Sequence, residues 1–494
     1  MSNFRERTIS SMRWSLFAKI GQQILLLIVN VVLARILVPS DFGLIAQIVV
    51  VTGFANLFAE LGFGAALIQR VDINRRQVSS VFWINVFSGF FLTIIFIIFA
   101  PLIANFYDEP ILSPLTKYIS TTFLIGSFSI IQVTLLTKNL EFRRIAVIEI
   151  SAALLSGIAA ILMAIYGYGV WSLVVQSVTF SLLLTILSWL LSDWKPTLEF
   201  NFGEVKELLG FSTNLLGTQS LNYWVRNIDN LLVGKVLGPD SLGIYSRAYS
   251  IMLFPLNNIS NVIARVMFPS FSMIQEDKYR VKSIFLRITR TIALFTFPLM
   301  LGLMVSVSPF VLTVFGSKWI EMIPVLRILC LVGLTQSIIT LIGNIYLSQG
   351  RSDVQFKVGL ILRLNLIIGI VLGLKWGVIG VATGYAIASF INIYPNVFFA
   401  GRLINLKFSD LVHSLSGVFF CSVAMALFVY GIGFVLPSDW SNFIILVSQI
   451  TSGLFIYLLL INIFHIKAYE DARDIFIAEI KPWLRYKKMS QPNG

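Results

Sequence analysis

Apolar stretches about twenty residues long recur from one end of the chain to the other. An α-helix rises about 1.5 Å per residue, so each stretch is long enough to cross the roughly 30 Å hydrocarbon core of a membrane. The sequence therefore predicts an all-α integral membrane protein with about fourteen transmembrane helices. We expect these helices near residues 14–37, 42–65, 80–104, 115–137, 145–166, 169–192, 209–237, 241–265, 286–312, 322–347, 356–374, 377–400, 412–436 and 442–464.

The composition of the chain excludes a water-soluble fold. Hydrophobic residues make up 57% of the 494 positions and charged residues 12%, whereas soluble domains carry roughly twice that share of charge. The formal net charge is +13, but the basic residues lie in short loops between apolar stretches and form no soluble basic domain. We therefore expect membrane lipids, and no nucleic acid, among the partners.

The loops between the expected helices differ in Lys and Arg content on the two sides of the membrane. If the N-terminus is cytoplasmic, the loops on its side contain Arg70, Arg75, Arg76, Lys138, Arg143, Arg144, Lys278, Arg280, Lys282, Arg351, Lys357, Arg402 and Lys407. The opposite loops contain little beyond Lys117, Lys318 and Lys375. Cytoplasmic loops carry an excess of positive charge. The sequence therefore predicts a multi-pass membrane protein with both termini in the cytoplasm.

Two distant segments resemble each other, which indicates an internal repeat. Residues 33–43 read LARILVPSDFG and residues 233–243 read VGKVLGPDSLG. A second pair, residues 167–171 and 375–379, again marks a tight turn between two helices. Six expected helices separate the members of each pair, so both halves enter the membrane from the same side, as a parallel repeat. The alternative is chance similarity between turns rich in leucine and valine.

The repeat predicts how the chain is divided. We expect an N-terminal six-helix lobe (1–192), a cytoplasmic linker (193–208), a C-terminal six-helix lobe (209–400), additional helices 13 and 14 (401–464) and a cytoplasmic tail (465–494). The two lobes are expected to face each other across a cleft. Residues 467–488 form either an amphipathic helix on the membrane surface or a solvated tail.

Short motifs spread over the chain carry a family resemblance. Besides residues 33–43, they are ALIQR at 66–70, LEFR at 140–143, RNIDNLL at 226–232, FPSF at 268–271 and FGSKW at 315–319. Together they resemble the Wzx-type polysaccharide flippases of the multidrug/oligosaccharidyl-lipid/polysaccharide exporter superfamily, especially the colanic-acid and teichuronic-acid branch. The resemblance spans essentially the full length and implies a MATE-like fold of two six-helix lobes plus two further helices.

The same resemblance implies a substrate, an activity and a location in the bacterial inner membrane. A Wzx-type flippase translocates undecaprenyl-pyrophosphate-linked repeat units to the outer leaflet, for exopolysaccharide, O-antigen or related surface polysaccharides. A lipid-linked oligosaccharide is therefore the expected substrate, and the polysaccharide polymerase and export machinery are candidate partners.

No catalytic motif accompanies this resemblance. The chain lacks His-Glu-x-x-His, Gly-x-Ser-x-Gly and a glycine-rich phosphate loop, and its expected extracytoplasmic loops are too short for a folded catalytic domain. Cys330 and Cys421 lie inside apolar stretches, and His413 and His465 lie at expected cytoplasmic helix ends. We therefore expect no enzyme activity, no catalytic residues, no cofactor and no metal site.

Ionisable and polar side chains inside the expected helices are the candidate binding residues. A charged side chain at the bilayer centre costs on the order of 2.5 to 3.5 kcal/mol, so these groups are expected to face protein or water. In the cleft between the lobes they would form a cationic cavity for a pyrophosphate, whose oxygens match the forked donors of arginine. The candidate substrate-binding residues are Arg226, Arg247, Arg327, Asn222, Gln219, Arg35 and Lys235.

Structural alternatives exist for several of these charges. Arg226 and Asp229 lie one helical turn apart, so they can simply neutralise each other. Arg35 and Lys235 lie near helix ends, from which their charged groups can extend to the membrane surface.

The energy for transport has two candidate sources. A membrane potential of 100 mV favours the export of each negative charge by about 2.3 kcal/mol. Proton or sodium antiport is equally open, with Asp229, Glu60 and Glu149 as speculative coupling sites.

Three other functions compete with a flippase. A cation-coupled drug antiporter of the same fold predicts a cavity dominated by acids and aromatic rings. A sugar polymerase requires a large extracytoplasmic loop, which this sequence lacks. A scaffold leaves the intramembrane charges unexplained.

Overall fold

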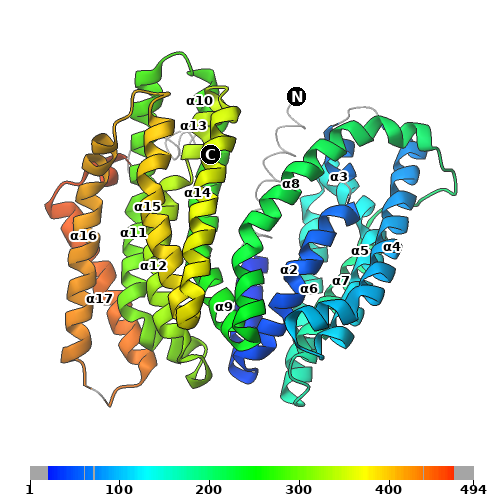
Figure 1. The fold of residues 1–494 in the computed structure, drawn as a ribbon, viewed down its shortest axis with the longest axis horizontal. Coiled ribbons are helices and arrows are strands. Elements are labelled where there is room, and N and C mark those ends of the chain that lie inside the picture. The colour runs from blue at the N-terminus through cyan, green and yellow to red at the C-terminus, as the bar shows by residue number, and fades with distance from the viewer. Residues whose placement is uncertain (1–20, 61, 70–72, 438, 472–494) are drawn as a thin grey trace, which may run out of the picture. The chain divides into compact units, whose positions relative to one another are not determined.

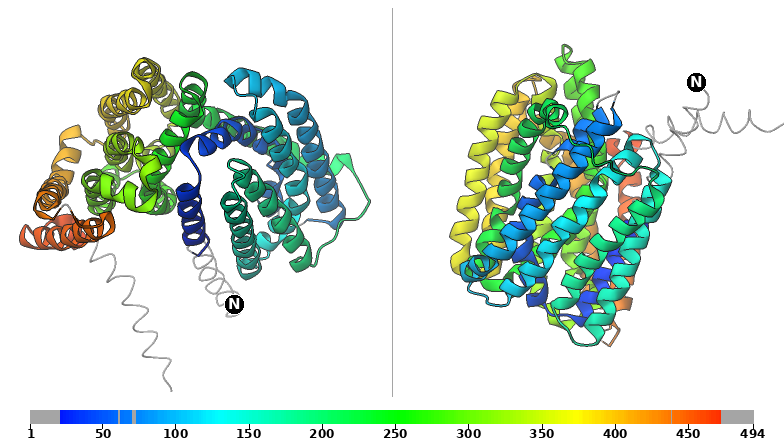
Figure 2. Two further views of the ribbon diagram at one scale, coloured as in Figure 1. Left: turned by 90° about the horizontal axis from the view of Figure 1, so that it is seen from below. Right: turned by 90° about the vertical axis from the view of Figure 1, so that its right-hand side faces the viewer.

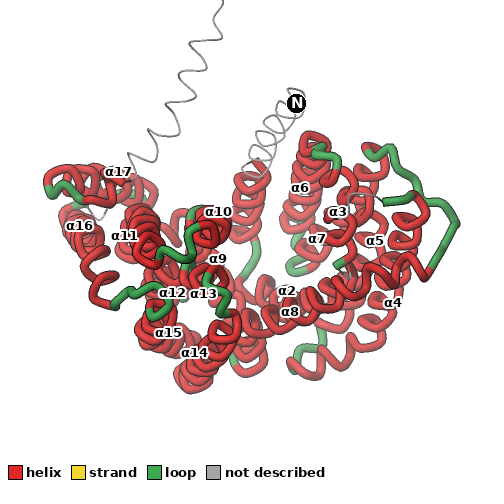
Figure 3. The backbone as a smooth tube through the Cα atoms, turned by 90° about the horizontal axis from the view of Figure 1, so that it is seen from above, coloured by secondary structure: helices red, strands yellow, loops and turns green. Residues whose placement is uncertain are grey.

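The computed structural model describes residues 21–60, 62–69, 73–437 and 439–471, and every regular element in this part of the chain is a helix (Figure 1). The helices of each unit run side by side (Figure 2) and are joined mostly by short loops (Figure 3). Inside hydrocarbon no water is present to bond the backbone, so a spanning segment satisfies its own N–H and C=O groups as a helix. The all-α prediction is confirmed.

The chain divides into two compact units, Met1–Gly243 and Ile244–Gly494, and the boundary lies inside α9. The first unit contains the helix Gly21–Ile36, α2 (Pro39–Glu60), α3 (Phe63–Gln69), α4 (Arg75–Tyr107), α5 (Leu112–Lys138), α6 (Phe142–Ile165), α7 (Trp171–Leu191), α8 (Phe202–Val236) and the start of α9 (Gly238–Asn258). The second contains the rest of α9, α10 (Ser260–Met273), α11 (Lys278–Val314), α12 (Met322–Ile339), α13 (Ile342–Ser348), α14 (Ser352–Gly373), α15 (Gly377–Gly401), α16 (Phe408–Val435) and α17 (Asn442–Ile463).

The described residues contain 10 helical segments that are long and apolar enough to cross a membrane. They are Pro39–Ala59, Arg75–Tyr107, Leu112–Lys138, Phe142–Ile165, Trp171–Leu191, Lys278–Val314, Met322–Ser348, Ser352–Gly401, Phe408–Val435 and Asn442–Ile463. One of them, Ser352–Gly401, contains both α14 and α15, whereas α8 and α9 are not among the ten. The protein is a multi-pass membrane protein, and the total of about fourteen helices stays a prediction.

Three of the expected helices are interrupted. The helix expected at 42–65 ends at Glu60, and α3 follows after Gly62, whose φ of 70° suits a residue without a side chain. The helix expected at 241–265 is divided between α9 and α10 shortly after Pro255, and that at 322–347 between α12 and α13. The sequence stays apolar between α12 and α13, so hydropathy does not reveal that interruption, whereas Asn257, Asn258 and Ser260 make the sequence polar between α9 and α10.

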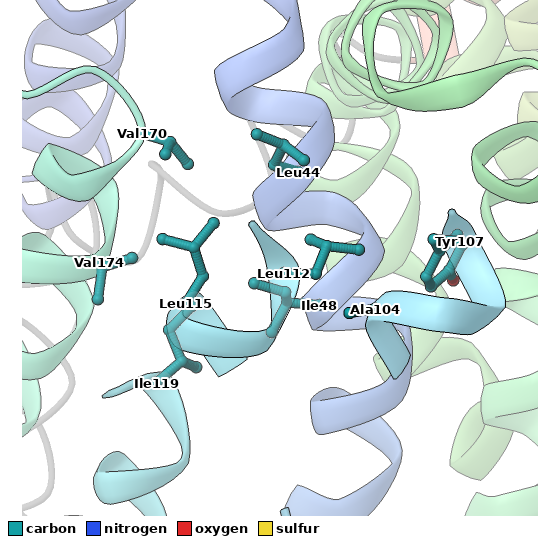
Figure 4. Close-up of a cluster of buried hydrophobic side chains, with 9 residues drawn as sticks. All are labelled: Leu44, Ile48, Ala104, Tyr107, Leu112, Leu115, Ile119, Val170 and Val174. Atoms are coloured by element: carbon teal, nitrogen blue, oxygen red, sulfur yellow. The ribbon is translucent and has the colours of Figure 1, made fainter. Parts of the chain in front are cut away.

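A buried apolar cluster holds α2, α4, α5 and the start of α7 together in the first unit (Figure 4). Ile48 of α2 and both Leu112 and Leu115 of α5 are 0% exposed, and Tyr107 at the end of α4 is 3% exposed. Because the cluster includes Leu44 and Ile48, it fixes the first turns of α2 within the unit. The first copy of the sequence repeat ends at Gly43, directly before Leu44.

The two copies of the repeat meet within the first unit. A Cβ atom on Gly43 would lie 1.7 Å from the carbonyl oxygen of Pro239, and one on Gly243 would lie 1.9 Å from that of Pro39. Each glycine therefore admits the backbone of the other copy. Two copies of one motif that are related by a local two-fold axis make the same contact in both directions. Chance similarity of the two segments would not explain such a reciprocal contact.

Small residues also allow α14 and α15 to approach each other in the second unit. A Cβ atom on Gly384 would lie 2.0 Å from the carbonyl oxygen of Gly369, and one on Gly380 would lie 2.3 Å from that of Gly373. The small-xxx-small spacing of α15 is therefore used for helix packing.

Candidate substrate-binding site

The second half of α8 is fixed against α2 by polar and aromatic contacts within the first unit. The hydroxyl of Tyr223 donates to the carbonyl oxygens of Val49 and Val50, at 2.9 Å from each. Phe54 packs against the rings of Tyr223 and Trp224, with centroids 6.0 and 5.1 Å away. These contacts set the rotation of α8 about its axis and hence the direction in which its other side chains point.

A further contact fixes the last turn of α8. The side-chain amide of Gln47, which is fully buried, donates from Nε2 to the carbonyl oxygen of Gly234 at 2.9 Å. A Cβ atom on Gly234 would lie 3.1 Å from Gln47 and 3.2 Å from the ring of Tyr107. The last turns of α8 are therefore packed on both α2 and the end of α4.

Arg226 lies on a face of α8 that these contacts leave open. Arg226 and Gln219 are both exposed and lie seven residues apart, which places them on one stripe of the helix. Asp229 is only 6% exposed, and one of its oxygens, Oδ1, accepts the backbone N–H of Asn230 at 2.8 Å. Among the described residues Arg226 forms no ion pair with Asp229, so the alternative in which the two charges neutralise each other is not observed.

Lys235 is in a different situation at the end of the same helix. Its ammonium group lies 2.6 Å from Oδ2 of Asp108 and 5.4 Å from the centre of the Phe106 ring. Asp108 ends α4 in a left-handed conformation, with φ of 59°. Lys235 therefore links the ends of α8 and α4, while Arg35 lies exposed in the last turn of the helix Gly21–Ile36.

The second unit contributes two further candidate arginines. Arg247 of α9 is partly buried, and Arg327 of α12 is exposed, with its Nη2 atom 3.5 Å from the hydroxyl of Ser308. Arg226 belongs to the first unit and these two to the second. The cationic cavity that would combine them therefore stays a prediction.

A cluster of tyrosine and amide side chains surrounds this part of α9 and escaped the sequence analysis. The side-chain amide of Gln336 donates to the hydroxyl of Tyr385 at 2.9 Å, and that hydroxyl lies 3.4 Å from the hydroxyl of Tyr249. The rings of Tyr245 and Tyr249 stack with centroids 6.0 Å apart. This cluster joins α9, α12 and α15, so it positions the helix that carries Arg247.

The sequence offered one weak signal for the cluster. Tyr245 and Tyr249 are four residues apart, on one face of a helix. Without a structure such a pair looks like ordinary core packing, because nothing in it points to Gln336 or Tyr385.

One of the speculative coupling residues borders a cavity. Glu149 of α6 is half-buried and lines a cavity of about 180 Å³ together with Ser129 and Thr134 of α5. Both hydroxyls donate to carbonyl oxygens of their own helix, at 2.7 Å, which leaves their lone pairs available as acceptors. The side chains of Glu60 and Asn222 lie outside the described residues.

Comparisons with known proteins agree with this architecture. A model of the family described as "Polysaccharide biosynthesis protein" matches residues 32–324. The lipopolysaccharide biosynthesis protein WzxC of Escherichia coli K12 is 30% identical over 445 residues, which cover 88% of this chain and 90% of WzxC. The teichuronic acid biosynthesis protein TuaB of Bacillus subtilis 168 is 29% identical over 443 residues, which cover 87% of this chain and 90% of TuaB.

A solved structure shares the fold. The lipid II flippase MurJ, in an inward closed conformation, matches with a TM-score of 0.73 and 19% identity, covering 94% of this chain and 99% of MurJ. The match extends over nearly the whole of both chains, so the expected all-α, flippase-like fold is confirmed, while the division into six-helix lobes stays a prediction.

Proposed function

Because the chain belongs to the polysaccharide biosynthesis protein family, we propose that it is a flippase, which translocates undecaprenyl-pyrophosphate-linked oligosaccharide repeat units from the cytoplasmic to the outer leaflet. The named relatives act in lipopolysaccharide and teichuronic acid biosynthesis, and they are matched over about nine tenths of their length. This function is transport and not enzymatic catalysis.

The structural observation that carries the proposal is the exposed guanidinium of Arg226, which forms no ion pair among the described residues. A cation inside a membrane-spanning unit is costly unless it serves an anionic substrate or an aqueous path. Arginine donates to phosphate through a fixed fork of N–H groups, which favours a pyrophosphate over a neutral sugar. Arg247 and Arg327 of the second unit, with the amide of Gln219, are proposed to complete the site.

The proposed mechanism is alternating access. The headgroup binds while the site is open to the cytoplasm, and a conformational change then opens the site to the outer side. The lipid tail stays in the bilayer throughout. With the cell interior at −100 mV, moving two negative charges outward is favourable by roughly 5 kcal/mol, so transport needs no ATP.

The orientation in the membrane belongs to the same proposal. Both termini are placed in the cytoplasm of a bacterial cell, in its inner membrane, because the basic loops then lie on the cytoplasmic side. The polysaccharide polymerase and export machinery are the proposed partners, since they use the product on the outer side.

A second candidate function, cation-coupled antiport, is favoured by one observation. The carboxyl group of Glu149 and the hydroxyl oxygens of Ser129 and Thr134 border one small cavity. Such a set of oxygen atoms can bind a proton or Na⁺. The same site is compatible with a flippase that exchanges its substrate for a cation, so the two functions differ in substrate and not in fold.

Reconstitution of the pure protein in liposomes tests the proposed function. An undecaprenyl-pyrophosphate oligosaccharide is placed in one leaflet, and its appearance in the other is followed with and without an imposed potential. We expect flipping above the rate of protein-free liposomes, accelerated when the destination side is positive. Rates equal to those of protein-free liposomes would refute the flippase, and rates independent of potential and of both ion gradients would refute the proposed energy sources.

A further inference from the structure

An open apolar groove lies on the first unit, away from the candidate site on the second half of α8. Its volume is about 700 Å³, and its walls are formed by Trp83, Phe87 and Phe90 of α4, Leu124 of α5, and Phe200 and Phe202 at the start of α8. Phe87 is 69% exposed and Phe202 is 58% exposed. Aromatic rings therefore face outward along a hollow, where hydrocarbon chains of the membrane can reach them.

The two walls of the groove are held together by hydrogen bonds. The indole N–H of Trp83 donates to the carbonyl oxygen of Thr197 at 2.8 Å. The hydroxyls of Ser79 and Ser80 accept the backbone N–H groups of Thr197 and Asn201, at 3.0 and 2.9 Å. The segment before α8 is thereby fastened to the first turns of α4. The groove is preformed, as binding pockets usually are.

Positive charge lies at one end of the groove. Arg76, Trp83, Phe87 and Phe90 are spaced by seven, four and three residues, so they follow one stripe of α4. Among the described residues Arg76 makes one loose ion pair, with Nε 4.0 Å from Oε2 of Glu199, and both side chains are more than half exposed. Its neighbour Arg75 is exposed and has no ion pair among the described residues.

The dimensions fit one leaflet of a membrane. Along α4, Trp83 lies about 10 Å and Phe90 about 21 Å beyond Arg76. A leaflet contributes about half of the roughly 30 Å hydrocarbon core. An acyl chain that starts at the level of the arginines therefore runs past the aromatic residues and ends near the membrane centre.

We propose that this groove binds an anionic phospholipid, whose acyl chain lies along Phe87 and Phe90 and whose phosphate lies at Arg75 and Arg76. The bound lipid fills the space between α4 and the start of α8 and so braces the segment that connects α7 to α8. In the orientation proposed above, it comes from the cytoplasmic leaflet. Binding itself requires only insertion in a membrane, so it does not depend on flippase activity.

The occupant is a resident lipid and not the lipid that the protein transports. Arg226, the proposed pyrophosphate ligand, lies roughly 36 Å along α8 from Phe202. A substrate whose headgroup lies at Arg226 therefore cannot place the same headgroup at Arg76.

Native mass spectrometry on the purified full-length protein tests the proposal. The delipidated protein is titrated with phosphatidylglycerol or with phosphatidylcholine of the same acyl chains. We expect tighter retention of phosphatidylglycerol, and its affinity should fall roughly tenfold or more in Arg75→Gln/Arg76→Gln, since each cation near the headgroups strengthens anionic binding. Arg280→Gln, which changes an exposed arginine of α11 in the other unit, should leave the affinity unchanged.

A second pair of variants tests the groove itself. Phe87→Ala should weaken phosphatidylglycerol retention, whereas Phe434→Ala, at an equally exposed apolar position of α16, should not. Melting temperatures without added lipid confirm that all four variants are folded. Equal retention of both lipids by the wild type, or equal effects of the groove and control variants, would overturn the proposal. Displacement of phosphatidylglycerol by an equimolar undecaprenyl phosphate would also overturn it.

Discussion

Two cations of α8, Lys235 at its end and Arg226 nearer its middle, were both predicted to bind substrate but differ in their surroundings. Lys235 lies against Asp108 and Phe106, in a region where Gly234 contacts Gln47 and where the repeated turns interlock through Gly43 and Gly243. Arg226 lies on an open stripe with Gln219 and has no ion pair among the described residues. The charge of Lys235 is therefore used in a contact within the unit, whereas the charge of Arg226 is available to a substrate.

Substitution of Gly43 or Gly243, where the repeated turns contact each other, should lower the stability of the protein most. Gly43→Ala and Gly243→Ala each place a Cβ atom within 2 Å of a backbone oxygen, which a side-chain rotation cannot relieve. We expect each substitution to destabilise the protein by about 1 to 3 kcal/mol or more. The measurement is the melting temperature in detergent together with the yield of folded protein.

Gly217→Ala is the matched control for that prediction. A Cβ atom on Gly217, inside α8, meets nothing within 4 Å, so alanine should be neutral or stabilise the helix by up to about 1 kcal/mol. If Gly43→Ala and Gly217→Ala melt at the same temperature, the reciprocal contact between the repeated turns is not formed.

The anchoring of α8 on α2 predicts a smaller effect. Tyr223→Phe removes the hydroxyl that donates to Val49 and Val50 but keeps the ring against Phe54. The loss should be about 0.5 to 1.5 kcal/mol, as for other intramolecular hydrogen bonds. Thermal unfolding of Tyr223→Phe beside the wild type measures it, and unchanged stability would mean that the hydroxyl of Tyr223 does not help to hold α8 on α2.

The ion pair at the end of α8 should contribute least to stability. Lys235 and Asp108 are 37% and 78% exposed in their side chains, and exposed pairs contribute about 0 to 1 kcal/mol. We expect Lys235→Met to melt close to the wild type and to retain its flipping rate. A large loss of flipping in a folded Lys235→Met protein would mean that Lys235 contacts the substrate.

The sequence predicted the helices and the repeat of this fold but not the interruption at Gly62. Apolar length revealed the helices, and the recurrence of Pro39 and Gly43 at Pro239 and Gly243 revealed the repeat, because both are properties of the chain itself. The interruption at Gly62 was missed, because a single backbone conformation does not alter the apolar character of the segment.

The candidate site was less predictable for a related reason. Hydropathy does not tell which side of a helix faces a neighbour, so Lys235 and Arg226 received the same role. The partner of Lys235, Asp108, lies 127 positions away in the chain, and Gln336 is joined to Tyr385 across two helices. Such pairs become visible only when the helices are packed together.

Flipping by Arg226→Ala tests the central claim most directly. Proteoliposomes containing the wild type, Arg226→Ala, Arg226→Lys or the exposed control Arg280→Ala are compared at equal amounts of folded protein. The account predicts that Arg226→Ala melts like the wild type but flips the pyrophosphate-linked oligosaccharide roughly 10- to 100-fold more slowly, the expected cost of losing hydrogen bonds to a charged group. Arg226→Lys should be intermediate, because it keeps the charge without the forked donors, and Arg280→Ala should match the wild type. Wild-type flipping by a folded Arg226→Ala protein would contradict the account.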